Sequence, residues 1–450
     1  MRNLTCPVGY SAAPAHGYQR MRSHRGRLLP ALRRTALRSP MTTDHLATNP
    51  ITRRVNEFAS RVHDVQERQL YLYLEPVEAL RGPRVTIEGR SLLLGASYSY
   101  LGLLGHPEIE AAANAAVAHY GTGTHGVRLL AGNTDLHDRL ERRIATFIGA
   151  DAAVVYSSGY VANVAAITTL VGRGDVVVCD KLDHASIIDG CLLSGARLVR
   201  VPHNAIAAVD RALAEAPAGA GTLVVVDAVF SMDGDVIDLP ALVEVCQRRK
   251  AWLMVDESHS LGVLGRDGRG IESHFGLPGT IDIKMSSLSK SIPSVGGYIA
   301  GRPELSALLK HTSRAFVFSA ALPPGSAAAC LAAFDLLERE PQRVERLRQN
   351  YLALRRGLRA GGLEVRDDPT AIVPVITGND DAALTMARRL FDRGVFIPPI
   401  VSPAVPPHTS RLRVTVTAAH SAADVDEIVK GVVAAWNEVT PAFAHADRER

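Results

Sequence analysis

The chain has 450 residues and a net charge of +4, with 47% hydrophobic and 21% charged residues, a composition that excludes collagen-like, wholly disordered and coiled-coil proteins. Its length corresponds to two or three domains of about 150 residues each. No apolar run approaches the roughly 18 residues of a membrane-spanning helix, and the charge balance gives no broad basic surface, so the sequence predicts neither a transmembrane segment nor nucleic-acid binding.

The positive charge comes from the first 40 residues, which contain eight arginines and no Asp, Glu or Lys. This composition is typical of a mitochondrial transit peptide. However, lysine is rare throughout the chain, a bias expected of GC-rich codons, and in such a genome the segment would be a disordered tail or translated sequence upstream of Met41. We favour the second interpretation and describe residues 1–40 as a basic, disordered leader.

Residues 41–96 are predicted to form an N-terminal arm, with an amphipathic helix over 53–74 and a hairpin over 85–95. Residues 97–325 are predicted to form a large α/β domain, because short apolar runs alternate with helical stretches. Near-continuous apolar strands of this kind indicate a mostly parallel sheet covered by helices on both faces. The predicted strands are 152–156, 176–179, 197–201, 223–226, 252–255 and 281–285.

Residues 326–450 are predicted to form a smaller C-terminal α+β domain. It would contain a long helix over 326–358, strands over 372–376 and 411–417, and a terminal helix over 422–436. The fold class is therefore α/β, with a large mostly parallel domain and a smaller domain packed against it.

The cysteines and histidines show no metal or disulfide pattern. Five cysteines without CxxC spacing predict neither a disulfide framework nor a zinc site, and the histidines lack the short spacing of a helical metal site. We therefore expect no metal, and a reducing cytoplasm as the compartment. The cysteines are Cys6, Cys179, Cys191, Cys246 and Cys330.

Polar residues that follow apolar strands mark the predicted site, since ligands of doubly wound sheets bind beyond the carboxyl ends of the strands. Asp227, Asp256 and His184 occupy such positions, and Lys290 follows the run that begins at Ile281. Lys290 lies within Ser-Ser-Leu-Ser-Lys-Ser in a chain that otherwise uses arginine for most positive charges. A lysine amine can form a Schiff base, which a guanidinium cannot.

Pyridoxal phosphate (PLP) requires such a lysine, an anion opposite its ring nitrogen and an anion cradle for its phosphate. Asp256 can supply the ring anion. The segment 157–163 follows a strand and opens a helix, so its free N–H groups suit a phosphate. Ser287 and Ser289 add hydroxyl groups. Together these features predict PLP as the cofactor.

The sequence resembles the α-oxoamine synthases, which are fold-type I PLP enzymes, over roughly residues 50–440. The motifs that carry the resemblance are Tyr98-Ser-Tyr-Leu-Gly-Leu, His106-Pro-Glu, Gly121-Thr-Gly-Thr, Ser158-Gly-Tyr-Val-Ala-Asn163, Asp183-His-Ala-Ser186, Phe230-Ser-Met-Asp-Gly-Asp235, Val255-Asp-Glu-Ser-His-Ser260, Leu288-Ser-Lys-Ser291, Val295-Gly-Gly297 and Arg411-Leu-Arg-Val-Thr415.

The resemblance implies a role for each matching residue. Lys290 would bind the cofactor covalently and later move protons at the α-carbon of the amino acid, with Asp256 paired to the pyridinium. His184 would stack on the cofactor, and His259 and Ser231 would lie near its phenolic oxygen. Further implied cofactor contacts are Ser158, Gly159, Tyr160, Ser287, Ser289 and Ser319, and the implied substrate contacts are Tyr98, Ser99 and Arg413.

The family reaction is a decarboxylative Claisen condensation of an amino acid with an acyl thioester, which gives an α-amino ketone. Several stretches are most similar to serine palmitoyltransferases, so we expect L-serine and a long-chain acyl group. The segment 411–420 is equally similar to 8-amino-7-oxononanoate synthase, which joins L-alanine to a pimeloyl thioester. A secondary-metabolite member supplied by a carrier protein is a third alternative, and the thioester can be of coenzyme A or a carrier protein.

The resemblance also implies a homodimer in which the loop from Phe316 to Ser319 approaches the phosphate site of the partner subunit. A non-catalytic subunit of the same fold would be expected to lack a lysine at position 290. A dinucleotide-dependent dehydrogenase would need its Gly-rich turn after a strand, whereas the segment 121–126 follows a helical, Ala-rich stretch. An aminotransferase is the closest enzymatic rival, and it would release no carbon dioxide.

Overall fold

The structure is a computed structural model that describes residue 46 and residues 48–446. The predicted leader, residues 1–40, lies outside these residues. The chain divides into two compact units, 1–65 and 66–450. The described part of the first unit consists mainly of helix α1 (Pro50–Glu67), which is shorter than the predicted helix over 53–74. All the following elements belong to the second unit.

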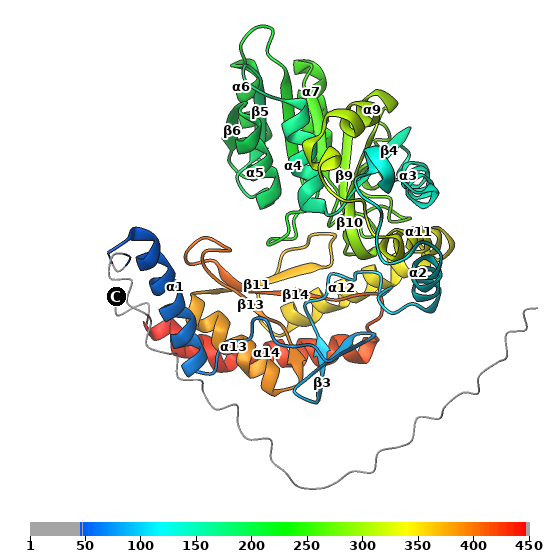
Figure 1. Cartoon of the computed structure of the whole chain (residues 1–450). Coiled ribbons are helices and arrows are strands. Elements are labelled where there is room, and N and C mark those ends of the chain that lie inside the picture. The colour runs from blue at the N-terminus through cyan, green and yellow to red at the C-terminus, as the bar shows by residue number, and fades with distance from the viewer. Residues whose placement is uncertain (1–45, 47, 447–450) are drawn as a thin grey trace, which may run out of the picture. The chain divides into compact units, whose positions relative to one another are not determined.

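A mixed sheet forms the centre of the large domain (Figure 1). Its order is β4-β10-β9-β8-β7-β5-β6, and all the pairs from β9 to β6 are parallel. Strand β10 runs antiparallel to both of its neighbours, β4 and β9. The strands are β4 (Ala152–Tyr156), β5 (Val176–Asp180), β6 (Arg197–Val201), β7 (Thr222–Asp227), β8 (Trp252–Asp256), β9 (Ile283–Ser289) and β10 (Pro293–Gly301).

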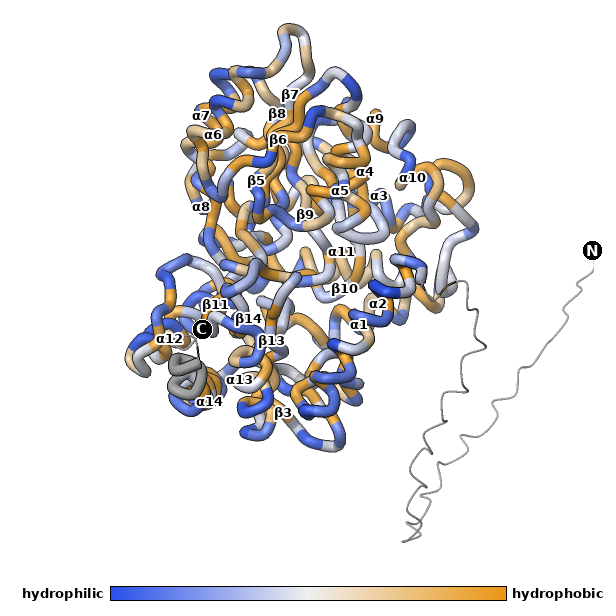
Figure 2. Tube along the Cα trace, turned by 90° about the vertical axis from the view of Figure 1, so that its left-hand side faces the viewer, coloured by the Kyte–Doolittle hydropathy of each residue, from blue (hydrophilic) through white to orange (hydrophobic). Residues whose placement is uncertain are grey.

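Both faces of this sheet are buried, which explains the continuous apolar runs of the sequence. Val177 and Val225 pack into a cluster with residues of α4, α5 and α9, whereas Val176 and Val224 pack with residues of α3 and α7. Figure 2 shows the hydrophobic colouring of β7 and β8. The covering helices are α3 (Asp135–Ile148), α4 (Gly159–Leu170), α5 (Ala185–Ser194), α6 (Ile206–Ala214), α7 (Leu239–Arg249), α8 (Ile271–Phe275), α9 (Pro303–Thr312) and α10 (Arg314–Val317).

The C-terminal part forms a smaller sheet of order β11-β14-β13, with α13 packed against all three strands. In Figure 1 this sheet lies between the large domain and helices α13 and α14. Strand β3 of the N-terminal hairpin pairs with β12 of this part. The elements are β1 (Ala79–Arg81), β2 (Arg84–Ile87), β3 (Arg90–Leu94), α2 (Pro107–Tyr120), α11 (Pro324–Arg339), α12 (Gln342–Ala360), β11 (Ile372–Gly378), α13 (Asp380–Asp392), β12 (Val395–Phe396), β13 (Pro399–Ile400), β14 (Ser410–Thr415) and α14 (Ala422–Ala446).

The expected strands of the large sheet are confirmed, as are β11 and β14, but one long helix is not. The helix predicted over 326–358 is two helices, α11 and α12, which are separated at Glu340 and Pro341. Glu340 has φ −122° and ψ 56°, outside the helical region, because the ring of a following proline disfavours that conformation. Strand β10 was not predicted, because its Ser- and Gly-rich sequence lacks a strand pattern.

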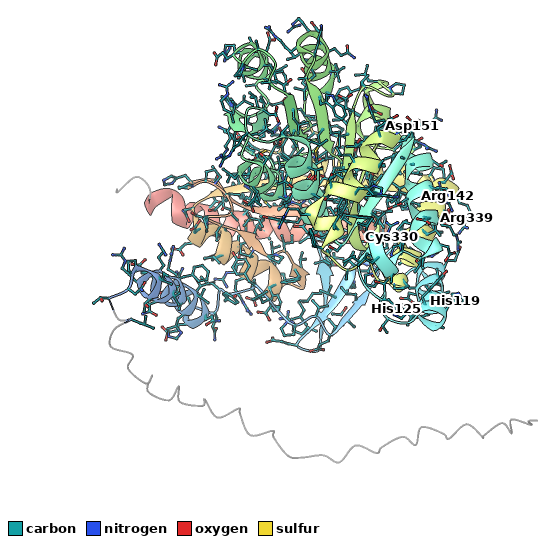
Figure 3. The ribbon with its side chains drawn as sticks, turned by 45° about the horizontal axis from the view of Figure 1, so that its top comes forward. His119, His125, Arg142, Asp151, Cys330 and Arg339 are labelled. Atoms are coloured by element: carbon teal, nitrogen blue, oxygen red, sulfur yellow. The ribbon has the colours of Figure 1, made fainter. Side chains whose placement is uncertain are left out.

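The histidine, cysteine and acidic side chains of the described residues form no metal-binding cluster. No group of three or more His, Cys, Asp or Glu side chains among them could hold a metal ion. Figure 3 labels His119, His125 and Cys330, which come from separate segments. The four described cysteines are free and buried. None of the helices in this part of the chain combines the length and apolarity needed to cross a bilayer.

Candidate active site

A cavity of about 260 Å³ lies beyond the carboxyl ends of β7, β8 and β9. It is the place where a doubly wound sheet binds ligands. Every predicted cofactor residue except Ser319 lines it. These residues are Ser158, Gly159, Tyr160, His184, Ser231, Asp256, His259, Ser287, Ser289 and Lys290.

Lys290 enters the cavity directly after the last residue of β9. Its Nζ donates a hydrogen bond to the Ser287 hydroxyl at 3.1 Å. Burial lowers the pKa of Lys290, although the charges of Asp256 and Asp227 oppose this shift. A lowered pKa increases the fraction of neutral amine, which is the form that acts as a nucleophile or a base.

Asp256 is the last residue of β8 and is 4% exposed. One carboxylate oxygen accepts a hydrogen bond from the Asn163 side-chain amide at 2.7 Å, and the other accepts the Ser258 backbone N–H at 2.9 Å. A buried carboxylate that is fixed in this way provides a directed negative charge inside the cavity.

Asp227 lies directly beside Asp256, since the two residues are register partners at the ends of β7 and β8. Burial and the charge of Asp256 raise the pKa of Asp227 well above its usual value. Its carboxylate accepts the backbone N–H of His184 at 2.8 Å, so it fixes the start of α5. The sequence placed Asp227 at a strand end but did not select it as a site residue.

The N-terminus of α4 forms one wall of the cavity. Ser158 is the N-cap residue, and its hydroxyl accepts the Val161 N–H at 3.2 Å. The first N–H groups of a helix have no partner within it, so they favour an anion. A Cβ at Gly159 would come within 2.7 Å of the Ser287 Cβ, and one at Gly297 within 2.6 Å of the Gly159 Cα. Only glycines permit this close approach.

His184 is the N-cap residue of α5. Its Nδ1 hydrogen-bonds the Ser186 hydroxyl at 2.7 Å, and that hydroxyl in turn accepts from the Asn163 amide at 2.9 Å. Partial burial lowers the pKa of His184. The Tyr160 ring lies edge-on to the imidazole, with centroids 6.2 Å apart, and its hydroxyl donates to Asp189.

His259 connects the cavity to the C-terminal sheet. Its Nδ1 lies 2.7 Å from the Tyr100 hydroxyl, which accepts a hydrogen bond from Arg413 at 3.2 Å. Burial, aided by the charges of Lys290 and Arg413, holds the pKa of His259 well below its usual value. The Tyr100 hydroxyl can then donate a hydrogen bond to Nδ1. In that case the one N–H of the neutral imidazole is at Nε2.

Arg413 is buried on β14, with its guanidinium 4.8 Å from the centroid of the Tyr98 ring. Its Nε donates to the Ser231 carbonyl. The structure thus brings Tyr98, Arg413 and Ser231 together beside the cavity. Ser99 is next to Tyr98 in the chain, and its hydroxyl accepts the Leu104 N–H at 3.3 Å. Tyr98, Ser99 and Arg413 are not among the residues that line the cavity itself.

Ser319 does not line the cavity of its own chain. The sequence also missed three residues that the structure places at the site, Asn163, Ser186 and Tyr100. Asn163 lies one helical turn after Gly159, on the same side of α4. This spacing could have placed Asn163 at the site from the sequence alone. Tyr100 comes from a segment far from His259 in the sequence, so no local pattern could have paired them.

These residues fit PLP. A lysine amine, a fixed carboxylate and a helix N-terminus converge on one cavity, as the cofactor requires. The Asn163 side-chain oxygen is buried without a hydrogen-bond partner among the described residues. Lys290 would hold the cofactor, Asp256 would face its ring nitrogen, and the N-terminus of α4 would receive its phosphate.

Comparisons with known proteins identify the family of the chain. The model of the family "aminotransferase class I and II" matches residues 92–432. An 8-amino-7-oxononanoate synthase of Geobacter sulfurreducens is 43% identical over 85% of this chain and 98% of its own length. A serine palmitoyltransferase of Sphingobacterium spiritivorum is 36% identical over 87% and 98%. The structure of a serine palmitoyltransferase from S. paucimobilis, with a bound PLP–myriocin aldimine, is similar with a TM-score of 0.83 and 32% identity, over 86% of this chain and 98% of that one.

We expect Asp256→Asn to weaken PLP binding by about 100-fold, because removal of one partner from a buried charge pair typically costs about 3 kcal/mol. Titration of the apoprotein with PLP, followed by visible absorbance, measures this change. Asp210→Asn, at a surface ion pair with Arg249, is the matched control and should bind as the wild type does. Unchanged PLP affinity in Asp256→Asn would mean that a different acid faces the ring nitrogen.

Proposed function

Because the chain belongs to the aminotransferase class I and II family, and within it to the PLP-dependent α-oxoamine synthases, we propose that it is an 8-amino-7-oxononanoate synthase. Its substrates would be L-alanine and a pimeloyl thioester. The observation that carries the enzymatic part is the convergence of Lys290, Asp256 and His184 on one cavity. The choice of substrate is supported by the higher identity to the relative of that name, 43% against 36% for the serine palmitoyltransferase.

The expectation of L-serine and a long-chain acyl group becomes the second candidate. The similarity to the solved serine palmitoyltransferase, with a TM-score of 0.83, favours it. Both candidates use the same chemistry. They differ in the side chain of the amino acid and in the acyl group of the thioester.

In this reaction a carbon–carbon bond forms between the α-carbon of the amino acid and the thioester carbonyl, and the thiol leaves. The carboxylate of the amino acid is then lost as carbon dioxide, and a proton takes its place to give the α-amino ketone. PLP, when bound, supplies an electron-accepting ring that stabilises negative charge at the α-carbon.

The residues of this chain supply the binding and the proton transfers. Lys290, whose pKa is lowered by burial, would take the proton from the α-carbon and later return one. Arg413, held by Ser231 and Tyr100, would bind the carboxylate, a task that suits a planar guanidinium. His259, neutral because its pKa is lowered, would donate a hydrogen bond through Nε2 into the cavity.

The choice between L-alanine and L-serine can be measured with the PLP-loaded protein. We expect L-alanine with a pimeloyl thioester to give the highest kcat/KM for carbon dioxide release. L-Serine should be at least about tenfold poorer, since a site shaped for a methyl group discriminates modestly. Tighter binding of L-serine together with faster reaction of a palmitoyl thioester would establish the second candidate, and transamination without carbon dioxide would contradict both.

We also propose a cytoplasmic homodimer. The buried free cysteines suit a reducing compartment. The position of Ser319 outside the cavity of its own chain supports its action on the partner subunit, and Phe318 beside it is 75% exposed. Sedimentation at assay concentration should show a dimer, and mixing Lys290→Ala with Ser319→Ala subunits should restore some activity if the sites are composite. A fully active monomer would contradict the proposal.

A further inference from the structure

The loop of residues 230–235, which follows β7, holds two arginines of the C-terminal sheet. The Ser231 carbonyl accepts Arg413 Nε. Arg411, two positions earlier on the same face of β14, donates to the Met232 carbonyl at 3.0 Å and to the Asp233 carboxylate at 2.7 Å. The position of this loop therefore determines where both guanidinium groups lie.

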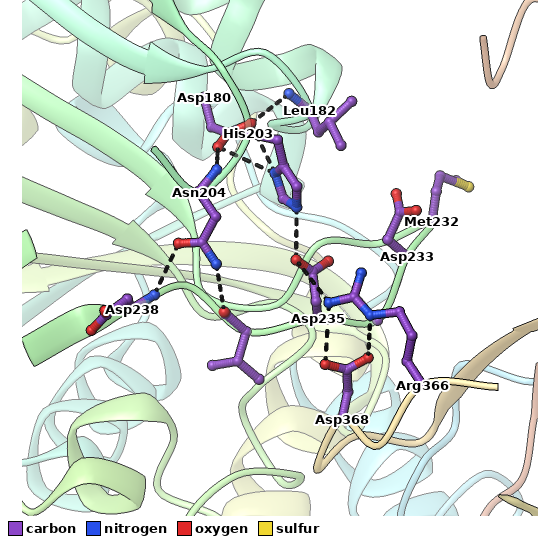
Figure 4. A network of polar contacts seen from close by, with 12 residues as sticks. Asp180, Leu182, His203, Asn204, Met232, Asp233, Asp235, Asp238, Arg366 and Asp368 are labelled. Atoms are coloured by element: carbon purple, nitrogen blue, oxygen red, sulfur yellow. Dashed lines mark hydrogen bonds and ion pairs between the residues drawn. The ribbon is translucent and has the colours of Figure 1, made fainter. Parts of the chain in front are cut away.

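His203 fixes the other end of this loop (Figure 4). Its Nε2 hydrogen-bonds Asp235 at 2.7 Å, and its Nδ1 lies 3.2 Å from Asp180. Both carboxylates are buried, with 3% and 2% of their surface exposed. Asp180 also accepts the backbone N–H groups of Leu182 and Asn204, at 2.8 and 2.6 Å. An imidazole thus connects the loop to the end of β5.

A second part of the C-terminal domain, residues 355–372, also contacts the loop. Arg366 lies 3.7 Å from Asp235 and 3.2 Å from Asp368. The Thr370 hydroxyl donates to the Gly234 carbonyl at 2.6 Å. The buried Arg355 donates to the carbonyls of Arg366, Thr370 and Ile372, so this part of the C-terminal domain is itself fixed.

His203 is charged at neutral pH. The hydrogen bonds to Asp180 and Asp235 raise its pKa from 6.5 to about 9. The same contacts lower the pKa of Asp180, although its burial acts in the opposite direction. The Phe230 ring lies edge-on to the imidazole, with centroids 4.4 Å apart. Removing the cation would leave two buried carboxylates without their shared partner.

We propose that His203 is a positioning residue for amino acid binding, which acts through Asp235 and the 230–235 loop to hold Arg413 in place. His203 contacts Asp235 and Asp180 at the end of the loop opposite Ser231, so it would act through the loop that holds Arg413 and not on the reacting atoms. The inference rests on the proposed role of Arg413 in binding the substrate carboxylate. It makes the junction between the two domains part of the substrate site.

The test uses the PLP-loaded protein with His203→Gln and Asp235→Asn, and His274→Gln as the control. His274 is an exposed histidine of α8. Two quantities are measured: amide hydrogen exchange of peptides that cover residues 228–238, without substrates, and steady-state constants for both substrates. Both site variants should raise exchange in this segment and raise KM for the amino acid by about tenfold. The KM for the acyl thioester and kcat should change less than about twofold, and the control should match the wild type.

Other outcomes overturn the proposal. Unchanged exchange in residues 228–238 would mean that His203 does not hold the loop. A fall in kcat, or an equal rise in KM for both substrates, would indicate a general structural role. The variant Arg413→Met separates this inference from the proposed function. An unchanged KM for the amino acid in that variant would refute the role of Arg413 in substrate binding. The exchange data would still decide whether His203 fixes the loop.

The pH dependence of stability gives an independent measurement. A raised pKa means that the stabilisation by His203 is complete below pH 6.5 and is lost as the pH rises through about 9. The charged groups that contact it are Asp180 of β5 and Asp235 of the loop. The next charged groups of the network are Arg366, which lies near Asp235 and Asp368, and Arg411, which pairs with Asp233. We expect the difference in melting temperature between wild type and His203→Gln to be large at pH 6 and to shrink above pH 9. A constant difference would mean that the cation is not the stabilising form.

Discussion

The burial of carboxylates at the carboxyl ends of neighbouring parallel strands is the constraint on which the rest of this site depends. Asp180, Asp227 and Asp256 end β5, β7 and β8, which are adjacent in the sheet. An ionised carboxylate without partners is costly in a protein interior, so each one requires donors or cations nearby. The amide of Asn163, the backbone N–H of His184 and the cation of His203 meet this requirement.

The same requirement connects the site to the domain junction. On one side, the carboxylate of Asp256 favours the charged form of Lys290 while burial opposes it, and this balance leaves an amine that can exchange protons. On the other side, Asp235 and His203 hold the loop that carries Ser231, and Ser231 holds Arg413. Electrostatic compensation of buried charge therefore fixes the residues on both sides of the cavity, those that would hold PLP and those that would bind the amino acid.

The sequence predicted the parts of this site that are local in the chain. Lys290 and Asp256 directly follow or end apolar strands, and Ser158 precedes a helix, so strand and helix boundaries were enough to find them. Contacts between distant segments could not be found in this way. The pairing of Tyr100 with His259 spans 159 positions, and the contact of His203 with Asp235 depends on how two loops fold over one sheet. The role of Ser99 as a substrate contact stays a prediction, and its hydroxyl accepts the backbone N–H of Leu104.

The proposed chemistry requires that Lys290 binds PLP covalently. Treatment of the PLP-loaded protein with borohydride, followed by proteolysis and mass spectrometry, identifies the modified lysine. We predict a single pyridoxyl group on the peptide that contains Lys290, and no such group after Lys290→Ala. Modification of another lysine, such as Lys181 beside the His184 segment or the ion-paired Lys284, or a visible absorbance that persists in Lys290→Ala and remains reducible, would contradict it.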